Sequence, residues 1–196
     1  MTEQRQQRFR EVLQRRQRDL TVVFENVDDP HNVAACLRSC DAVGISDVFI
    51  LNSKGKTQSR LSEKTSASAA RWLSLHHHQD VVACMQQVRQ RYGRVLAAAI
   101  NPQAVSLFEV DFLPPTAIVF GNEKDGISQP LLASCDGLIH IPQVGMIQSL
   151  NISVACAVIL YEAFRQRRQA GYYQRPPDPV WMEETFSYWL LRDQKR

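Results

Sequence analysis

The run LTVVFENVDDPHNVAACLRSCDAVGISDVFIL, residues 20–51, contains a complete β–α–β pattern. Residues 20–26 and 47–51 are rich in β-branched and aromatic side chains, which favours two strands. Between them, Asp29 suits a helix N-cap, Pro30 suits the first helical position, and Gly44 suits the position just after a helix. Strands joined through a helix usually pair in parallel, so this stretch predicts the start of a parallel α/β sheet.

The alternation of strand and helix patterns continues along the chain. Four more β-rich runs follow, at residues 71–76, 94–100, 116–122 and 137–142. Helical segments separate them, and Gly93 is expected just after one of these helices. Six strands interleaved with helices predict an α/β fold with a mainly parallel six-stranded sheet and flanking helices, because a closed barrel of this type needs eight strands.

Length and composition suit one compact domain, since the chain has 196 residues, of which 44% are hydrophobic. We place this domain at residues 20–171, after a basic amphipathic helix within residues 1–19. Residues 172–196 predict a proline-stiffened linker and a helix too apolar to stay exposed, which packs on its own domain or on a second subunit. No apolar run approaches the ~20 residues that span a bilayer, and the first residues do not resemble a signal peptide, so we expect a soluble cytoplasmic protein without a membrane partner.

The cysteines and histidines do not form a recognisable disulfide or metal pattern. The five cysteines are widely spread and include no C-x-x-C pair, which favours reduced packing residues. His76, His77 and His78 stand in a row, but adjacent residues of a strand point to opposite faces and no second ligand cluster has suitable spacing. We interpret the histidines as polar surface and expect no bound metal.

Positive charge is concentrated at two places, although the formal net charge is only +3. Residues 1–18 contain six arginines and only two acidic residues. Four more arginines crowd the end of the long helical pattern before residue 170 and the segment that follows it: Arg165, Arg167, Arg168 and Arg175. This asymmetry indicates a polyanionic partner. The alternative is a solvated helix face with favourable cations at a helix C-terminus.

The loops after the strands carry most information about function, because ligands of parallel α/β sheets bind outside the carboxyl ends of the strands. Three of these loops are unusual: ENVDDPHNVAACLRSCDAVG at 25–44, FGNEKDGIS at 120–128, and the segment 141–151. The eight glycines never have the G-x-G-x-x-G spacing of dinucleotide-binding turns, and no Walker pattern is present. A nucleotide-like cofactor would therefore be held by backbone groups in irregular loops.

These three loops together resemble the SpoU, or TrmH-type, branch of the SPOUT family of RNA 2′-O-ribose methyltransferases. N-x-x-A-x-x-R occupies residues 32–38, F-G-N-E-x-x-G-I occupies 120–127, and I-P-x-x-G-x-x-x-S-L-N-x-S-x-A occupies 141–155. The order and spacing are those of the family, and the match covers residues 20–170. Each motif alone would be weak evidence, whereas the three in this order are specific.

The resemblance implies a C-terminal deep trefoil knot, S-adenosyl-L-methionine bound in a bent shape within it, and a homodimer with its active site near the subunit interface. Within the family, the chain is most similar to the branch that methylates a D-loop guanosine of tRNA. It shares with that branch the sequence DPHNVAACLR, an arginine-rich first helix and the lack of a separate RNA-binding domain. We therefore expect a tRNA 2′-O-ribose methyltransferase whose nucleic-acid partner is tRNA and not DNA. The alternatives are the same chemistry on ribosomal RNA, and a non-catalytic RNA-binding protein.

The resemblance assigns catalytic roles to five residues: Asn32, Arg38, Glu123, Ser149 and Asn151. Arg38 would either take the proton of the ribose 2′-hydroxyl or stay charged and stabilise the developing alkoxide. The first role is chemically awkward, because a guanidinium hardly gives up its proton. Asn32 would orient Arg38 or the ribose, and Glu123 would fix Arg38 or its loop. Ser149 and Asn151 would hold the ribose, the phosphate or Arg38.

Each of these residues also has an ordinary structural interpretation. Arg38 could form an exposed pair with Asp41, three residues further along the helix. Asn32 could belong to a helix start, and Glu123 to a polar turn. Ser149 could be the N-cap of the long helix, with Asn151 in its first turn.

Two further sets of residues are predicted to bind ligands. The resemblance places the cofactor against apolar side chains and backbone amides, from the set Ala98, Gly121, Ile141, Met146 and Leu150. Core packing is the competing interpretation for the apolar members, and Gly121 and Gly126 could equally be turn glycines. The concentration of charge predicts the RNA-binding residues, which are Arg8, Arg15, Arg16, Arg165 and Arg168.

Overall fold

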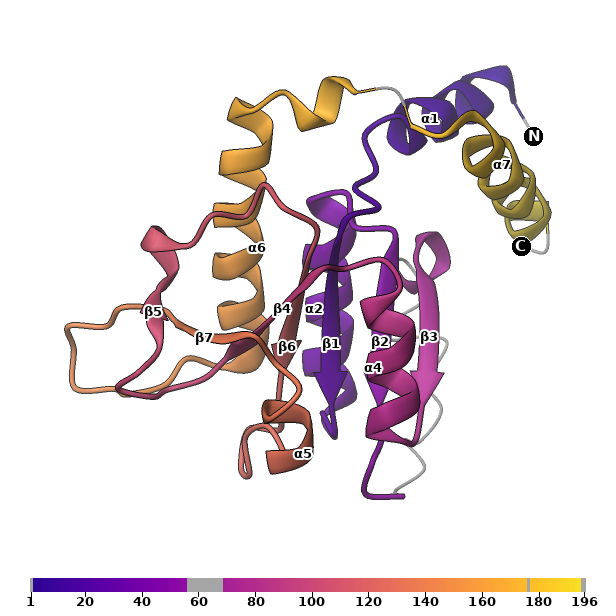
Figure 1. The fold of residues 1–196 in the computed structure, drawn as a ribbon. Helices are drawn as coiled ribbons and strands as arrows, with labels where there is room; N and C mark the ends of the chain where they lie inside the picture. The colour runs from indigo at the N-terminus through magenta and orange to yellow at the C-terminus, as the bar shows by residue number, and fades with distance from the viewer. Residues whose placement is uncertain (1, 56–68, 176, 195–196) are drawn as a thin grey trace.

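A parallel seven-stranded sheet forms the centre of the molecule (Figure 1). The computed structural model describes residues 2–55, 69–175 and 177–194. The strands are β1 (Leu20–Glu25), β2 (Asp47–Leu51), β3 (Ser74–His78), β4 (Arg94–Ala98), β5 (Val105–Ser106), β6 (Thr116–Phe120) and β7 (Gly137–His140). They lie in the order β3-β2-β1-β6-β4-β7-β5, and each neighbouring pair is parallel.

The six predicted strands all form, and β5 adds a seventh strand of two residues at the edge of the sheet. The third strand begins later than its prediction of 71–76, because residues Ala70–Trp72 form the short helix η1. This turn directs the ring of Trp72 onto Phe9 and Trp189, at centroid distances of 5.1 and 5.2 Å. Aromatic packing outside the sheet therefore shortens the strand at its start.

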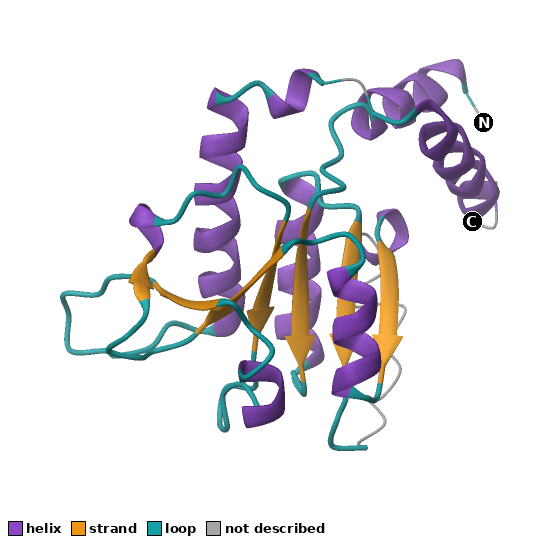
Figure 2. Cartoon of the chain, viewed as in Figure 1, coloured by secondary structure: helices purple, strands orange, loops and turns teal. Residues whose placement is uncertain are grey.

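Helices cover both faces of the sheet (Figure 2). On one face, α2 (Pro30–Ala42) and α6 (Ile152–Gln169) pack on the larger hydrophobic core; on the other, α4 (Val81–Arg89) and α5 (Gln129–Leu132) pack on a second core. Side chains along β1 alternate between the two faces of the sheet and contribute to both cores. Val22 and Phe24 belong to the first core and Val23 to the second. Because both faces of such a strand are buried, its residues are mostly apolar without alternation, as the sequence of β1 shows.

The predicted boundaries are correct for α2 but not for the end of α4. Asp29 is the N-cap of α2 and accepts a hydrogen bond from the backbone N–H of His31, and Gly44 follows the helix with φ +86°. Gly93 does not follow its helix directly, because α4 ends at Arg89 and the chain continues through further turns. The prediction for Gly93 was therefore wrong by several residues.

The C-terminal part of the chain threads through an earlier loop. After β4, residues 99–115 form β5 and η2 (Leu107–Glu109) and return to β6; we call this segment the knot loop. β7 lies between β4 and β5, so the chain runs through the knot loop before it forms α6. Gln166 of α6 then hydrogen-bonds Val110 and Phe112 of the loop, at 2.9 and 2.8 Å. This threading is the predicted trefoil-knot arrangement.

The two terminal helices pack against each other beside the sheet (Figure 1). Phe9 and Leu13 of α1 (Glu3–Leu13) contact Phe186 and Trp189 of α7 (Pro179–Gln194), and η3 (Tyr172–Gln174) leads from α6 toward α7. The apolar last helix thus packs on its own chain. None of the helices in the described ranges is both long and apolar enough to cross a bilayer.

Candidate active site

Three polar side chains from distant parts of the chain meet at the carboxyl edge of the sheet. The amide nitrogen of Asn32 donates to Glu123 Oε1 at 2.6 Å, and the amide nitrogen of Asn151 donates to Asn32 Oδ1 at 3.1 Å. All three side chains are at the surface and none is buried. The structure thus brings three of the five predicted catalytic residues together, and we call this trio the polar relay.

The start of α6 presents Asn151 to the relay. Asn151 is the N-cap of α6, and its Oδ1 accepts hydrogen bonds from Ser153 N at 2.8 Å and Ser153 Oγ at 2.6 Å. Its amide nitrogen therefore points away from the helix, toward Asn32. The capping prediction for Ser149 was wrong by two residues, because the first free N–H groups of α6 are satisfied by Asn151.

A tight turn holds Glu123. Asn122 and Gly126 exchange backbone hydrogen bonds of 3.0 and 2.9 Å, and Gly126 adopts φ +69°. A Cβ on Gly121 would come within 2.3 Å of the Gly126 backbone, so this position requires glycine for the turn itself. The turn-glycine interpretation therefore accounts for Gly121 without a cofactor.

Arg38 lies apart from the polar relay within one chain. α2 is continuous from Pro30, so six residues of helix separate Arg38 from Asn32, about 240° of rotation and 9 Å along the axis. The Arg38 side chain is exposed and has no hydrogen bond or ion pair with a residue that the structure describes. Its alternative partner, Asp41, is taken by the Arg16 guanidinium at 2.5 Å. The simple structural interpretation of Arg38 therefore fails, and its charge is available to a ligand.

Ser149 and the predicted cofactor residues lie on or beside the loop after β7. Ala98 ends β4 next to β7, and Ile141 follows β7; both pack against the main core. Met146 is 99% exposed, and Ser149 and Leu150 are also exposed. Residues 143–150 make no backbone-to-backbone hydrogen bond with another described residue. The loop thus offers free amides next to exposed apolar side chains, which suits a planar base with polar edges.

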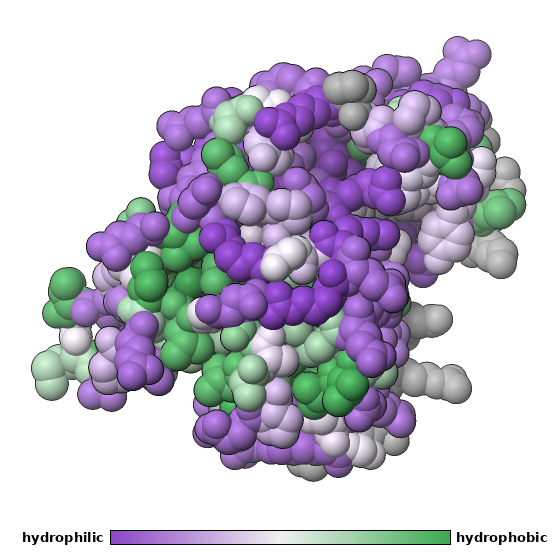
Figure 3. All heavy atoms as spheres, viewed as in Figure 1, coloured by the Kyte–Doolittle hydropathy of each residue, from purple (hydrophilic) through white to green (hydrophobic). Residues whose placement is uncertain are grey.

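Exposed apolar side chains continue from this loop onto the knot loop. Figure 3 shows them gathered over β5, β7 and the loop beyond β7. The large exposed side chains in this region are Ile100, Val105, Phe108, Val144, Met146, Ile147, Leu150 and Val154. We call this set the apolar knot face. Soluble monomers rarely expose so many neighbouring apolar groups, so the set marks a binding surface.

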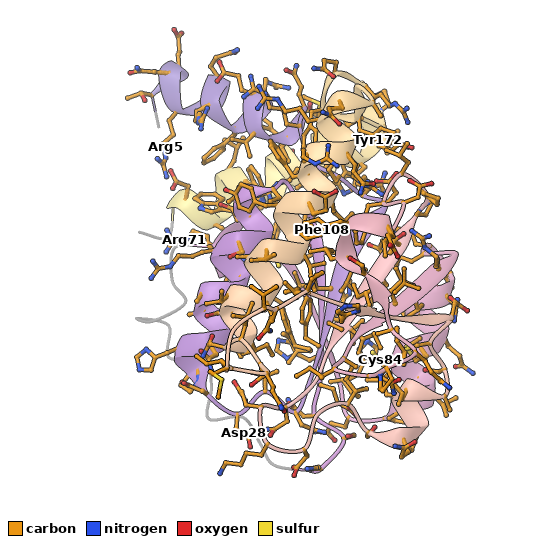
Figure 4. All side chains as sticks on the ribbon, turned by 90° about the vertical axis from the view of Figure 1, so that its left-hand side faces the viewer. Arg5, Asp28, Arg71, Cys84, Phe108 and Tyr172 are labelled. Carbon is orange, nitrogen blue, oxygen red and sulfur yellow. The ribbon has the colours of Figure 1, made fainter. Side chains whose placement is uncertain are left out.

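A hollow lies at the opposite end of α6 from the polar relay. It has a volume of about 770 Å³ and is lined by α1, the end of α2 and the end of α6, including Arg8, Arg15, Arg168 and Tyr173. We call it the basic groove. α6 has 18 residues and so is roughly 27 Å long, which separates the groove from Asn151. In Figure 4, Asp28, a hydrogen-bond partner of Asn122, lies at one end of the molecule and Tyr172 at the other.

Three of the five predicted RNA-binding arginines line the basic groove, and the other two have partners within the chain. Arg8, Arg15 and Arg168 line the basic groove and are exposed. Arg16 is only 5% exposed and donates to Ile45 O at 2.6 Å, to Trp72 O at 3.1 Å and to Asp41. Arg165 is held by Glu162 at 2.7 Å. Arg16 is therefore removed from the RNA-binding set, because its donors are used inside the protein.

Arg167 is likewise structural, although its position in the sequence suggested a surface cation. It is fully buried, pairs with Asp19, and donates from Nε to Phe112 O at 2.8 Å. A buried guanidinium surrounded by carbonyls joins the knot loop to the segment before β1. Nothing in the local sequence distinguishes it from its exposed neighbours.

The cysteines are not candidate nucleophiles. Burial raises the pKa of Cys84 to about 12 and that of Cys135 to about 11. Burial also raises the pKa of Cys156, whose thiol lies beside those of Cys36 and Cys40 between α6 and α2. In the described ranges no group of three or more His, Cys, Asp or Glu residues could hold a metal ion.

Comparison with known proteins shows which family the chain belongs to. The family model for the SpoU rRNA Methylase family matches residues 19–161. The chain belongs to this family. One relative in the family is tRNA (guanosine(18)-2′-O)-methyltransferase from Thermus thermophilus, which is 46% identical over 192 residues, covering 97% of this chain and 98% of the relative.

Solved structures show the same family fold. The TrmH/SpoU tRNA modifying enzyme from A. aeolicus superposes with a TM-score of 0.88 at 36% identity and covers 97% of both chains. The SpoU methyltransferase AviRb from Streptomyces viridochromogenes, crystallised in complex with the cofactor AdoMet, superposes with a TM-score of 0.69 at 27% identity, over 78% of this chain and 62% of that one. The knotted fold predicted from the three motifs is thereby confirmed.

Proposed function

We propose that this protein is a tRNA (guanosine(18)-2′-O)-methyltransferase that uses S-adenosyl-L-methionine. The polar relay of Asn32, Glu123 and Asn151 is the observation on which this rests, because it joins one residue from each motif of the family in a single hydrogen-bonded set. The substrate is taken from the full-length similarity to the Thermus thermophilus relative.

The residues of the carboxyl edge suit the cofactor. Free amides of residues 143–150 can bind the edge of an adenine, while Ile141, Met146 and Leu150 offer apolar contacts. Once bound, S-adenosyl-L-methionine supplies a methyl group on a positively charged sulfur. Gly121 contributes by permitting the turn that holds Glu123 close to this loop.

Methyl transfer then requires an activated ribose oxygen. The ribose 2′-oxygen would form a bond to the methyl carbon of the bound cofactor, the carbon–sulfur bond would break with its electron pair left on sulfur, and the hydroxyl proton would pass to solvent water. The Asn32 and Asn151 amides can orient the ribose, while Glu123 fixes the Asn32 amide. Arg38 has no partner among the described residues and lies outside the relay within one chain. In the proposed mechanism its charge acts on the bound RNA, where it stabilises the developing alkoxide or binds the adjacent phosphate. In this role Arg38 keeps its proton, as a guanidinium does in nearly all settings.

The basic groove provides the main RNA contact. Arg8, Arg15 and Arg168 present three guanidiniums around a hollow with Phe164 and Tyr173 on its wall. Guanidiniums bind phosphates, and aromatic rings accept unpaired bases, so this surface suits a folded RNA. Because the groove lies roughly 27 Å from Asn151, the bound RNA must extend along α6 to reach the reaction site.

The active unit is proposed to be a homodimer. The apolar knot face adjoins Asn151, and a second copy packed on it would bury Val144, Met146 and Ile147 next to the reaction site. Burial of about 25 cal/mol per Å² of apolar surface favours such association. Sedimentation equilibrium should give twice the chain mass, and Met146→Asp should shift the protein toward the monomer.

Mass spectrometry of nucleosides tests the proposed reaction. Purified protein is incubated with S-adenosyl-L-methionine and either total tRNA or ribosomal RNA, alongside an Arg38→Ala variant. We expect 2′-O-methylguanosine in tRNA alone, at a D-loop guanosine, and loss of product with Arg38→Ala. Product in ribosomal RNA alone would assign the rival substrate. Binding of tRNA without any methylation would indicate a non-catalytic RNA-binding protein.

A further inference from the structure

A buried carboxylate lies beneath the polar relay. Glu25 is the last residue of β1, is 1% exposed, and forms no ion pair with a described residue. Its Oε2 accepts from Ser128 N at 2.7 Å, and its Oε1 accepts from Ser128 Oγ at 2.5 Å and Ser53 Oγ at 3.3 Å. Burying a carboxylate that has no ion pair with a described residue is unfavourable, even with three hydrogen-bond donors, so an apolar residue would suit this strand better for stability.

The next residue, Asn26, adds a second attachment. It adopts φ +51°, a left-handed conformation that asparagine tolerates better than most residues. Its carbonyl accepts from Asn122 Nδ2 at 2.6 Å, and its side chain donates to Ser53 Oγ at 2.9 Å. The left-handed turn is what aims this carbonyl away from the sheet and toward the loop after β6.

Glu25 and Asn26 together hold both ends of the turn that carries Glu123. Asn122 precedes Glu123 and is held through Asn26; Ser128 follows it and is held through Glu25. Glu123 itself is exposed, and among the described residues it has one hydrogen bond, to Asn32. An exposed carboxylate on a loose turn would sample many positions, so a fixed Glu123–Asn32 contact requires a fixed backbone.

We propose that Glu25 is a positioning residue for methyl transfer: through Ser128 it fixes the backbone of residues 121–128, and so holds Glu123 against Asn32. This rests on the proposed function of the polar relay. Glu25 touches neither the ribose nor the cofactor. Its effect on the reaction passes through Glu123, which distinguishes it from a residue that only stabilises the fold.

The test compares Glu25→Gln with Thr21→Val, a matched control on the same strand. Thr21 is equally buried, and its hydroxyl donates to Asp47 O at 2.6 Å at the other end of β1. Both variants should unfold at lower denaturant concentration than wild type. Below that range, Glu25→Gln should lower kcat about 10- to 100-fold with little change in KM for tRNA, whereas Thr21→Val should keep kcat. Equal kcat in wild type and Glu25→Gln would overturn the proposal.

The double variant Glu25→Gln with Glu123→Ala distinguishes a positioning role of Glu25 from a general loss of stability. If Glu25 acts through Glu123, Glu25→Gln should reduce kcat no further in a Glu123→Ala background, because the contact it supports is already lost. Multiplication of the two single losses would contradict this route. Ser128→Ala should reproduce a smaller part of the Glu25→Gln loss.

Amide hydrogen exchange tests whether Glu25 holds the turn without relying on a measurement of activity. Glu25→Gln should accelerate exchange across residues 121–128 and leave the α4 amides unchanged. If the wild-type protein methylates no tRNA, the proposed function fails, and exchange still decides whether Glu25 holds the turn. Unchanged exchange in this segment would refute the positioning role even in an active enzyme.

Discussion

Neutralising the basic groove should weaken the salt dependence of tRNA binding. The perturbation is a triple variant, Arg8→Gln, Arg15→Gln and Arg168→Gln, which removes the three groove guanidiniums. Each phosphate contact contributes about 0.7 to 0.9 to the slope of log K against log salt, so removing three contacts should reduce the magnitude of the slope by roughly 2.1 to 2.7. Between 50 and 200 mM salt, the loss of affinity should therefore become roughly 20- to 40-fold smaller than in wild type.

A second triple variant with the same charge change is the control: Arg5→Gln, Arg10→Gln and Arg165→Gln. These guanidiniums are held by Asp193, Glu183 and Glu162, at 2.5, 3.2 and 2.7 Å. Because acidic partners already occupy them, their replacement should change the slope by less than about 1. Fluorescence anisotropy with labelled tRNA over a salt series measures both slopes. Equal slopes for the two variants would show that net charge governs binding and would refute the assignment to the groove.

Three other predictions follow from the same contacts. Arg16→Met should destabilise the fold by about 2 to 4 kcal/mol in denaturant titrations, because it leaves Ile45 O, Trp72 O and Asp41 without their donor; a change below 1 kcal/mol would contradict this. The hydrogen bond from Arg89 lowers the pKa of Asp136, so the stabilisation from this pair is complete above about pH 4 and is lost as the pH falls further. Asp136→Asn should therefore reduce the decrease in unfolding free energy between about pH 4 and lower pH, and an unchanged decrease would argue against the pair. Burial raises the pKa of Cys84 to about 12, so Cys84 in the native protein should react far more slowly with a thiol reagent at pH 8 than in the unfolded protein, and equal rates would exclude its burial.

Local patterns in the sequence were sufficient to predict the strands, the helices and their layered arrangement. Strands buried on both faces read as short apolar runs, and the Asp29 cap and Gly44 marked the ends of α2 correctly. The direction of parallel strands predicted that the loops after them share one edge of the sheet. These inferences need only neighbouring residues and the direction of the strands. The pairing of β1 with β6, which brings Asn32 near Glu123, is visible only in the structure.

Properties set by distant contacts could not be read from the sequence pattern. β5 has two residues, too few for a periodic signal, and among the described strands it pairs with β7 alone. Arg16 and Arg167 look like surface cations, but carbonyls from remote segments surround them. Asn151, and not Ser149, is the N-cap of α6, and its amide also donates to Asn32, a contact that the local sequence does not record.

The knot and the role of Arg38 came from the resemblance alone. Threading of β7 through the knot loop is a relation between whole segments, and no local spacing records it. In one chain Arg38 lies about two helical turns from Asn32 and does not join the polar relay. Its catalytic role therefore stays a prediction, which the nucleoside analysis of Arg38→Ala addresses.

The central claim is that Asn32, Glu123 and Asn151 act as one unit in methyl transfer. The single-turnover rate of Asn32→Ala, at saturating tRNA and S-adenosyl-L-methionine, tests it most directly, because Asn32 bonds both partners. His31→Ala, the exposed neighbour in the same helix turn, is the control. We expect Asn32→Ala to lose about 100-fold in rate with unchanged tRNA affinity, while His31→Ala stays close to wild type. A rate for Asn32→Ala within about threefold of wild type would contradict the account.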